Sequence, residues 1–230
     1  MDVFPDNTLS HFLVKLPQTI TLEGSWEVAL MEIHYPHSWY NVVAGKNRIL
    51  YDATMGSEDH GIITLDAGYY HSIDSVIEAI RSKGLPDTIS MVYNDTSKRV
   101  TVGLGPGAAL FPFEGMAEML GFPRRAIHNT QVAPFQADIR TIYSLYVYSD
   151  LVEEQLVGDV RAPLLRIVNV EGENSDIITH AYNKPYFLPL KKREFDTIEI
   201  YIRDDTGQKV PFQRGKVIVT LAFRKRRPTL

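Results

Sequence analysis

The sequence predicts a mainly β protein, a single jelly-roll β-sandwich with a small α+β insertion. Two observations carry this prediction. Eight short runs of β-branched and aromatic residues, most of them with a period of two, are bounded by turn residues. These runs lie toward the two ends of the chain, whereas the middle carries helical spacing. Strands grouped in this way favour an antiparallel sandwich over alternating strand and helix units.

The eight expected strands leave residues 1–65 and 136–230 to the sandwich, enough chain for one jelly roll. Pro17 is expected to end the first strand, and Pro36 closes the second. The expected strands occupy residues 12–16, 26–33, 48–51, 61–65, 142–147, 164–170, 198–202 and 217–223.

Residues 66–135 are expected to form the insertion, as a helix, a hairpin and a second helix. Apolar residues recur at helical spacing after Ser72, a predicted N-cap. Ser75 stands where a capping box has Glu, so we expect the box to be incomplete. The hairpin joins residues 89–93 to 99–104 through a polar turn. The second helix covers residues 114–120 and ends at Gly121.

Composition excludes several classes of protein. A net charge of −4 and a pI near 6.0 argue against nucleic-acid binding spread over the whole surface. Zero cysteines exclude disulfides, thiol catalysis and thiolate metal sites. No apolar run approaches the roughly 20 residues of a membrane-spanning helix, and we expect no secretory signal at the N-terminus.

Two expected strands in the C-terminal half of the chain are apolar on both faces, although a sandwich strand ordinarily exposes one face to solvent. One face of residues 142–148 carries Tyr146 and Tyr148, and one face of residues 217–223 carries Ile218 and Ala222. Either the insertion or a loop covers these side chains, or they form a subunit interface, where tyrosine is enriched. Both interpretations stay open at this point.

Three motifs suggest catalysis or ligand binding, and each has a simpler interpretation. Residues 205–207 (Asp-Thr-Gly) match an aspartic-protease loop, but this chemistry needs two carboxylates, so we interpret the tripeptide as a turn. Residues 103–107 (Gly-Leu-Gly-Pro-Gly) lack the helix that a phosphate loop needs. Four histidines are considered as metal ligands and interpreted instead as surface residues: His34, His37, His60 and His71.

A basic run lies at the extreme C-terminus of this acidic chain. It consists of Arg224, Lys225, Arg226 and Arg227. Four positive charges attract phosphate without reading sequence, so we consider contact with nucleic acid or with an acidic partner, or a nuclear-import signal. A solubilising tail after the last strand is the alternative.

Several short sequence segments resemble those of one family of viral and transposon proteins. They lie at residues 7–12, 16–17, 24–30, 33–36, 116–122, 163–166, 198–200, 204–207, 211–212 and 215–219. In these segments the chain resembles the penton, or minor capsid, proteins of Polinton (Maverick) elements and adintoviruses.

The resemblance implies a structural protein without a cofactor. It implies a single jelly roll that forms a homopentamer at the fivefold vertices of an icosahedral particle, beside a separate double-jelly-roll major capsid protein. The expected location is the virion, and the interior of the host cell, including the nucleus, during assembly. A ring of this kind needs two different matching surfaces. Two other functions stay open: a β-sandwich ligand- or carbohydrate-binding module, and a hydrolase acting through Asp205.

Overall fold

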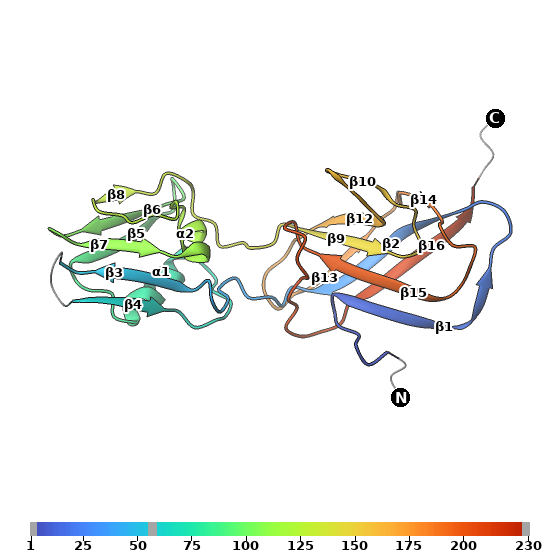
Figure 1. Ribbon diagram of the computed structural model, residues 1–230, viewed down its shortest axis with the longest axis horizontal. Coiled ribbons are helices and arrows are strands. Elements are labelled where there is room, and N and C mark those ends of the chain that lie inside the picture. The colour runs from blue at the N-terminus through green and yellow to red at the C-terminus, as the bar shows by residue number, and fades with distance from the viewer. Residues whose placement is uncertain (1–3, 55–58, 227–230) are drawn as a thin grey trace. The chain divides into compact units, whose positions relative to one another are not determined.

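A computed structural model describes residues 4–54 and 59–226 of the chain. It divides the chain into two compact units. Residues 1–39 and 142–230 form one unit, which we call the sandwich, and residues 40–141 form the second unit. Figure 1 shows both units with most of their strands labelled.

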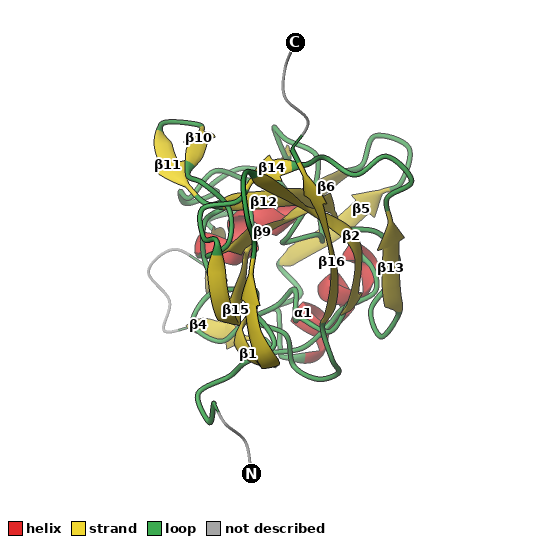
Figure 2. Cartoon of the chain, turned by 90° about the vertical axis from the view of Figure 1, so that its right-hand side faces the viewer, coloured by secondary structure: helices red, strands yellow, loops and turns green. Residues whose placement is uncertain are grey.

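The sandwich consists of two antiparallel sheets that face each other across a core (Figure 2). The first sheet has the order β1 (His11–Thr21), β15 (Glu194–Arg203), β9 (Ser144–Ser149) and β12 (Leu164–Asn169). The second is centred on β2 (Trp26–Pro36), with β13 (Ile177–Ala181) and β14 (Leu188–Pro189) along one edge and β16 (Ile218–Lys225) along the other. A separate hairpin pairs β10 (Gln155–Val157) with β11 (Val160–Ala162). This architecture confirms the predicted mainly β, jelly-roll class.

The first strand is longer than predicted. It continues through Pro17 to Thr21, although its register against β15 shifts between Lys15 and Ile20. β1 lies at the edge of its sheet, where a proline removes no hydrogen bond that a neighbour needs. The prediction that Pro17 ends the strand is therefore wrong.

The core of the sandwich contains a buried tyrosine. Tyr35 is fully buried, its ring stacks on His180 at 5.9 Å, and its hydroxyl donates to the carbonyl oxygen of Asn169 at 3.3 Å. The amide N–H of Glu171 donates to the same hydroxyl at 3.4 Å. Tyr35 thus joins β2 to the last residue of β12 and to the chain that follows it.

The second unit contains two three-stranded sheets and two helices. The elements are β3 (Arg48–Asp52), β4 (His60–Thr64), α1 (Ile73–Ser82), β5 (Ile89–Asn94), β6 (Arg99–Leu104), β7 (Ala109–Pro112), α2 (Glu114–Leu120) and β8 (Gln131–Val132). One sheet has the order β4-β3-β7 and the other β5-β6-β8. These elements enclose a hydrophobic core of their own.

The boundaries of this unit differ from the predicted insertion at residues 66–135. β3 and β4, which the sequence assigned to the sandwich, lie in the second unit. They pair with each other, and β3 also pairs with β7. Ile49 and Ile63 are consequently buried in the core of this unit and not between the sheets of the sandwich.

Both predicted helices are present. At α1 the Ser75 amide donates to the Ser72 hydroxyl oxygen at 3.1 Å, and the Ser72 amide donates to the Ser75 hydroxyl oxygen at 3.2 Å. The expectation of an incomplete capping box is therefore wrong, because the serine hydroxyl accepts where a glutamate ordinarily would. At α2 the chain leaves the helix through Gly121, in the left-handed conformation with φ 79°.

The described part of the chain contains no helix long and apolar enough to cross a lipid bilayer.

Replacing Gly121 by alanine should destabilise the second unit by more than about 2 kcal/mol. A Cβ at this position would overlap the backbone of Phe135, and its φ disfavours any side chain. Gly84→Ala is the control. Gly84 also has a positive φ, 95°, but an added Cβ would meet no atom within 4 Å, so this variant should lose only the conformational cost of about 1 kcal/mol. Chemical denaturation measures both. Equal losses for the two variants would contradict the close approach at Gly121.

The titration of Tyr35 should make the sandwich less stable at high pH. Burial, and secondarily the Glu171 carboxylate, raises the pKa of Tyr35 from 10.0 to about 12, although the Glu171 amide acts in the opposite direction. The neutral phenol is favoured in the folded state, so its contribution is complete below pH 10 and is lost as the pH rises through 12. Denaturation between pH 9 and 12 should show a shallower decline for Tyr35→Phe than for the natural chain. Tyr186→Phe, which removes an exposed hydroxyl, is the control. Identical pH profiles for Tyr35→Phe and the natural chain would refute the assignment.

Candidate subunit interface

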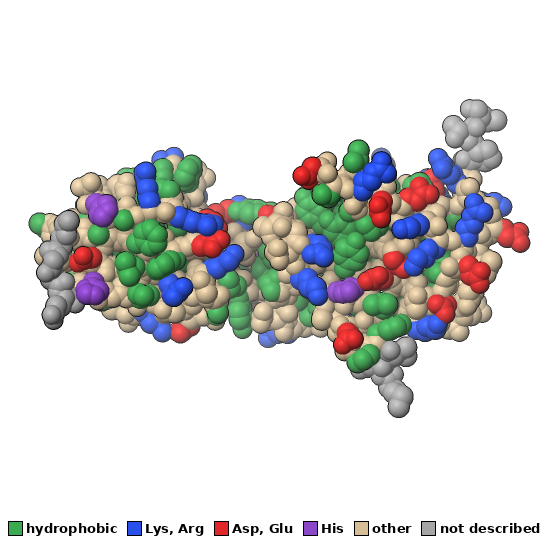
Figure 3. Space-filling model, in the orientation of Figure 1, with side chains coloured by type: hydrophobic (Ala, Val, Ile, Leu, Met, Phe, Trp, Pro, Cys, Tyr) green, Lys and Arg blue, Asp and Glu red, His purple; other side chains and the backbone are tan. Residues whose placement is uncertain are grey.

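The outer surface of the first sheet carries a cluster of apolar side chains. We call it the tyrosine face, and it consists of Tyr146, Tyr148, Tyr201 and Ile167. Tyr148 lies opposite Tyr201, and Tyr146 opposite Ile167, so the four share one side of the sheet. Figure 3 shows hydrophobic side chains gathered over β9, with charged side chains over β15 and β1.

Two of these tyrosines stack on each other. The rings of Tyr148 and Tyr201 are 4.8 Å apart between centroids and almost parallel, at 7°. Partial burial raises the pKa of both hydroxyls, and for Tyr201 the neighbouring Tyr148 raises it further. The stack is therefore an uncharged, half-exposed aromatic surface, of the kind that is enriched at protein interfaces.

Charged side chains border this stack. The Nε2 atom of His11 lies 2.6 Å from the Glu199 carboxylate, and the Arg203 guanidinium lies 5.8 Å from the Tyr201 ring centroid. A hollow of about 210 Å³ beside them is also lined by Lys209. The tyrosine face thus has an apolar centre and a polar rim, as interfaces between proteins commonly do.

The β10–β11 hairpin adds exposed aliphatic side chains beside the tyrosine face. Leu156 is 74% exposed and Val160 is 55% exposed. The Gln155 side-chain amide donates to the carbonyl oxygen of Leu164, which itself pairs with Tyr148. The hairpin is therefore held next to the tyrosine face while its own apolar residues face solvent.

The second sheet has a different open surface, which we call the isoleucine face. Thr179, His34 and Ile218 form one cross-strand row over β13, β2 and β16, and Ile177 lies opposite Pro36 beside that row. Ile177 is 76% exposed and Ile218 is 48% exposed. The isoleucine face is aliphatic where the tyrosine face is aromatic.

A polar group lies at the centre of the isoleucine face. The Nδ1 atom of His34 is 2.8 Å from the Thr179 hydroxyl oxygen, and its Nε2 atom is 3.1 Å from the Glu32 carboxylate. These two contacts fix the orientation of the imidazole on the outer side of the sheet.

The four residues predicted for an interface differ in exposure. Tyr146 and Tyr148 are half-buried and point outward, and Ile218 is exposed. Ala222 is half-buried, and Ala29, directly opposite on β2, is completely buried. This end of the second sheet is therefore covered within one chain, whereas the end that carries Ile218 is open.

Sequence reasoning missed several members of these surfaces. Tyr201 lies in a predicted strand, and alternation with its neighbours would have placed it outward. The hairpin was also missed, although Gly158 and Asp159 between two valines form a two-residue hairpin turn signal. Ile177 belongs to a strand that the sequence analysis did not identify.

The candidate catalytic tripeptide forms a turn after β15. The Asp204 carboxylate accepts hydrogen bonds from the amides of Thr206 and Gln208, each at 2.9 Å. The Asp205 carboxylate accepts from the Tyr143 amide at 3.4 Å. Asp205 therefore supports a neighbouring loop, which agrees with its interpretation as turn chemistry.

The glycine-rich segment is also a turn. The Ala108 amide donates to the carbonyl oxygen of Gly105 at 3.1 Å, which closes the turn between β6 and β7. The Gly105 amide itself donates to the carbonyl oxygen of Thr88 at 2.7 Å. The Gly105 amide is therefore already hydrogen-bonded within the protein and does not face a ligand.

The candidate metal ligands lie in different parts of the fold. His37 is buried, so its interpretation as a surface residue is wrong; its ring stacks on Trp39 at 4.2 Å within the sandwich, and burial lowers its pKa. His60 begins β4 and His71 precedes α1, both in the second unit. Within residues 4–54 and 59–226, no three His, Asp or Glu side chains group as metal ligands.

The basic run is partly engaged within the sandwich. The Arg224 guanidinium donates to the Glu27 carboxylate at 2.7 Å, and Arg226 lies 4.0 Å from the same carboxylate. Lys225 ends β16 and is exposed. Arg227 lies outside the described residues.

Comparison with solved structures identifies the same architecture in a capsid protein. The crystal structure of the mavirus penton protein is similar to this chain with a TM-score of 0.52 and 14% sequence identity. The match covers 93% of this chain and 90% of that chain. At this identity the likeness establishes a shared fold. No protein-family model matches the sequence, and no curated protein sequence matches it.

Proposed function

We propose that this chain is a structural capsid protein, a penton that forms the fivefold vertices of an icosahedral virus-like particle as a homopentamer. The observation that carries the proposal is the fold shared with the mavirus penton protein over 93% of the chain. The sequence resemblance to the pentons of Polinton elements and adintoviruses supports the same assignment. The role proposed here is non-enzymatic and requires no cofactor.

The two open faces support assembly as a ring. A closed ring uses a head-to-tail interface, in which one surface of each copy meets a different surface of the next. The tyrosine face and the isoleucine face lie on opposite sheets of the sandwich, and one is aromatic whereas the other is aliphatic. In the proposed ring the tyrosine face and hairpin of one copy cover the isoleucine face of its neighbour. A stable contact of this kind buries about 800 Å² on each partner.

The proposed partners and location follow from this role. A double-jelly-roll major capsid protein would surround each vertex, and the protein would reside in the virion after assembly in the host cell, including its nucleus. The C-terminal basic run would contact an acidic partner or nucleic acid.

One observation favours a second candidate, a carbohydrate-binding module. The hollow of about 210 Å³ beside Tyr201 combines an aromatic ring with the charged side chains of Glu199, Arg203 and Lys209. A half-exposed aromatic ring with polar neighbours suits the apolar face and the hydroxyls of a sugar. Glycan binding by monomers that Tyr201→Ala abolishes would favour this function over assembly.

Light scattering of the purified chain should give about five times the 26.1 kDa mass of one copy. Ile218→Asp should reduce this mass to that of a monomer, because it buries an unpaired charge in the interface, at a cost of several kcal/mol. Ile62→Asp is the matched control, since Ile62 is 53% exposed on a strand of the second unit. The Ile62→Asp variant should remain pentameric. A monomer from the natural chain at high concentration, or a pentamer from Ile218→Asp, would contradict the proposal.

Mixing two variants tests which surfaces meet. Tyr148→Asp damages the tyrosine face and Ile218→Asp the isoleucine face, so each variant alone should be monomeric. An equimolar mixture should form dimers, because one intact face from each variant remains available to the other. If either variant dimerises alone, like faces meet and the head-to-tail arrangement is refuted.

A further inference from the structure

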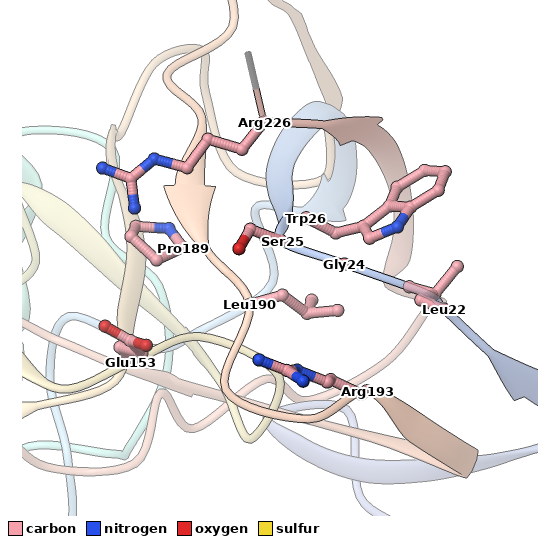
Figure 4. Close-up of a pocket in the computed structure, with 9 residues that line it drawn as sticks. All are labelled: Leu22, Gly24, Ser25, Trp26, Glu153, Pro189, Leu190, Arg193 and Arg226. Atoms are coloured by element: carbon pink, nitrogen blue, oxygen red, sulfur yellow. The ribbon is translucent and has the colours of Figure 1, made fainter. Parts of the chain in front are cut away.

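One end of the sandwich brings together two basic segments that are distant in sequence. One segment consists of Lys191, Lys192 and Arg193 and precedes β15. The other, residues 224–226, comprises the last two residues of β16 and the residue that follows it. Arg193 and Arg226 line the same pocket, which has a volume of about 100 Å³. Figure 4 shows both side chains extending toward the side of the pocket where Glu153 lies.

Backbone hydrogen bonds fix both arginines to one turn. The Leu22 amide donates to the carbonyl oxygen of Arg193 at 2.8 Å, and the Arg226 amide donates to the carbonyl oxygen of Ser25 at 2.9 Å. Both bonds end on the turn between β1 and β2, so the two side chains start from a defined scaffold. Gly24, in the same turn, lies close to the Lys225 side chain.

Carboxylates satisfy part of this positive charge. Glu27 pairs with Arg224 and, more loosely, with Arg226, and Asp150 pairs with Lys192. The other three cationic side chains of these two segments are Lys191, Arg193 and Lys225, and they form no hydrogen bond or ion pair with any described residue.

We propose that this end of the sandwich binds the phosphate backbone of nucleic acid, with one phosphate held in the pocket between Arg193 and Arg226. A guanidinium binds phosphate through paired N–H donors, and two guanidiniums from different segments surround it. The pocket is large enough for one phosphate group and too small for a nucleotide. Lys191 and Lys225, outside it, supply charge for neighbouring phosphates, which favours a polymer over a single ion.

The opposing charge of Glu153 makes the proposal testable in both directions. Its carboxylate lines the pocket and forms no ion pair within the described residues. Removing this carboxylate should strengthen binding of a phosphate, whereas removing either arginine should weaken it. A site that binds no anion would respond to neither change.

The test measures binding of a fluorescent 20-base-pair DNA to the full chain over a series of salt concentrations. The logarithm of the binding constant falls as the logarithm of the salt concentration rises. Arg193→Gln and Arg226→Gln should each make this fall less steep by about 1, the effect of one lost phosphate contact. Glu153→Gln should tighten binding about threefold by removing like-charge repulsion. Arg125→Gln, which removes an exposed arginine of the second unit, should leave the slope unchanged.

Two results would overturn the proposal. One is an unchanged slope for both pocket arginine variants when their thermal unfolding matches that of the natural chain. The other is a competition result in which polyglutamate displaces the fluorescent DNA as effectively as unlabelled DNA of equal charge does. This result would indicate that the pocket binds an acidic protein instead. Light scattering in the same buffers reports assembly separately, so a failure of the pentamer proposal is distinguishable from a failure of this one.

Discussion

The central strand of the second sheet, β2, determines how the sandwich is built. It is hydrogen-bonded along both edges, by β13 and β14 on one side and by β16 on the other. Its register against β16 shifts opposite Met31, so that Leu30 and Ile33 both face the core although three positions separate them. A slip of one residue would turn Tyr35 out of the core and His34 into it.

The same alternation that fills the core leaves apolar side chains outside. Each sheet of an ordinary sandwich has one wet face. Here the outer faces carry the Tyr148 and Tyr201 stack on one sheet and Ile177 and Ile218 on the other. In the proposed assembly these clusters are the surfaces that a neighbouring copy covers. Because they are unlike and belong to opposite sheets, they suit a repeating head-to-tail contact better than a twofold one.

The basic residues 191–193 and 224–226 belong to neither of these two faces. The net charge of −4 is a sum over the whole chain, and it conceals the cations that gather at that end of the sandwich. Glu27 and Asp150 neutralise some of them, and Arg193 is left without a partner in the described part of the chain. Assembly through the faces and anion binding at the end would therefore not compete for the same residues.

The sequence by itself determined the features whose signals are local. The period of two identified most strands, and Ser72 and Gly121 identified where α1 begins and α2 ends. Only the tertiary structure decided which strands pair. The sequence predicts β3 and β4 as strands of the sandwich. In the structure they pair with each other, and β3 also pairs with β7, within the second unit. The tyrosine stack and the pocket between Arg193 and Arg226 were likewise invisible, because each joins residues that are distant in the chain and meet only when strands pair.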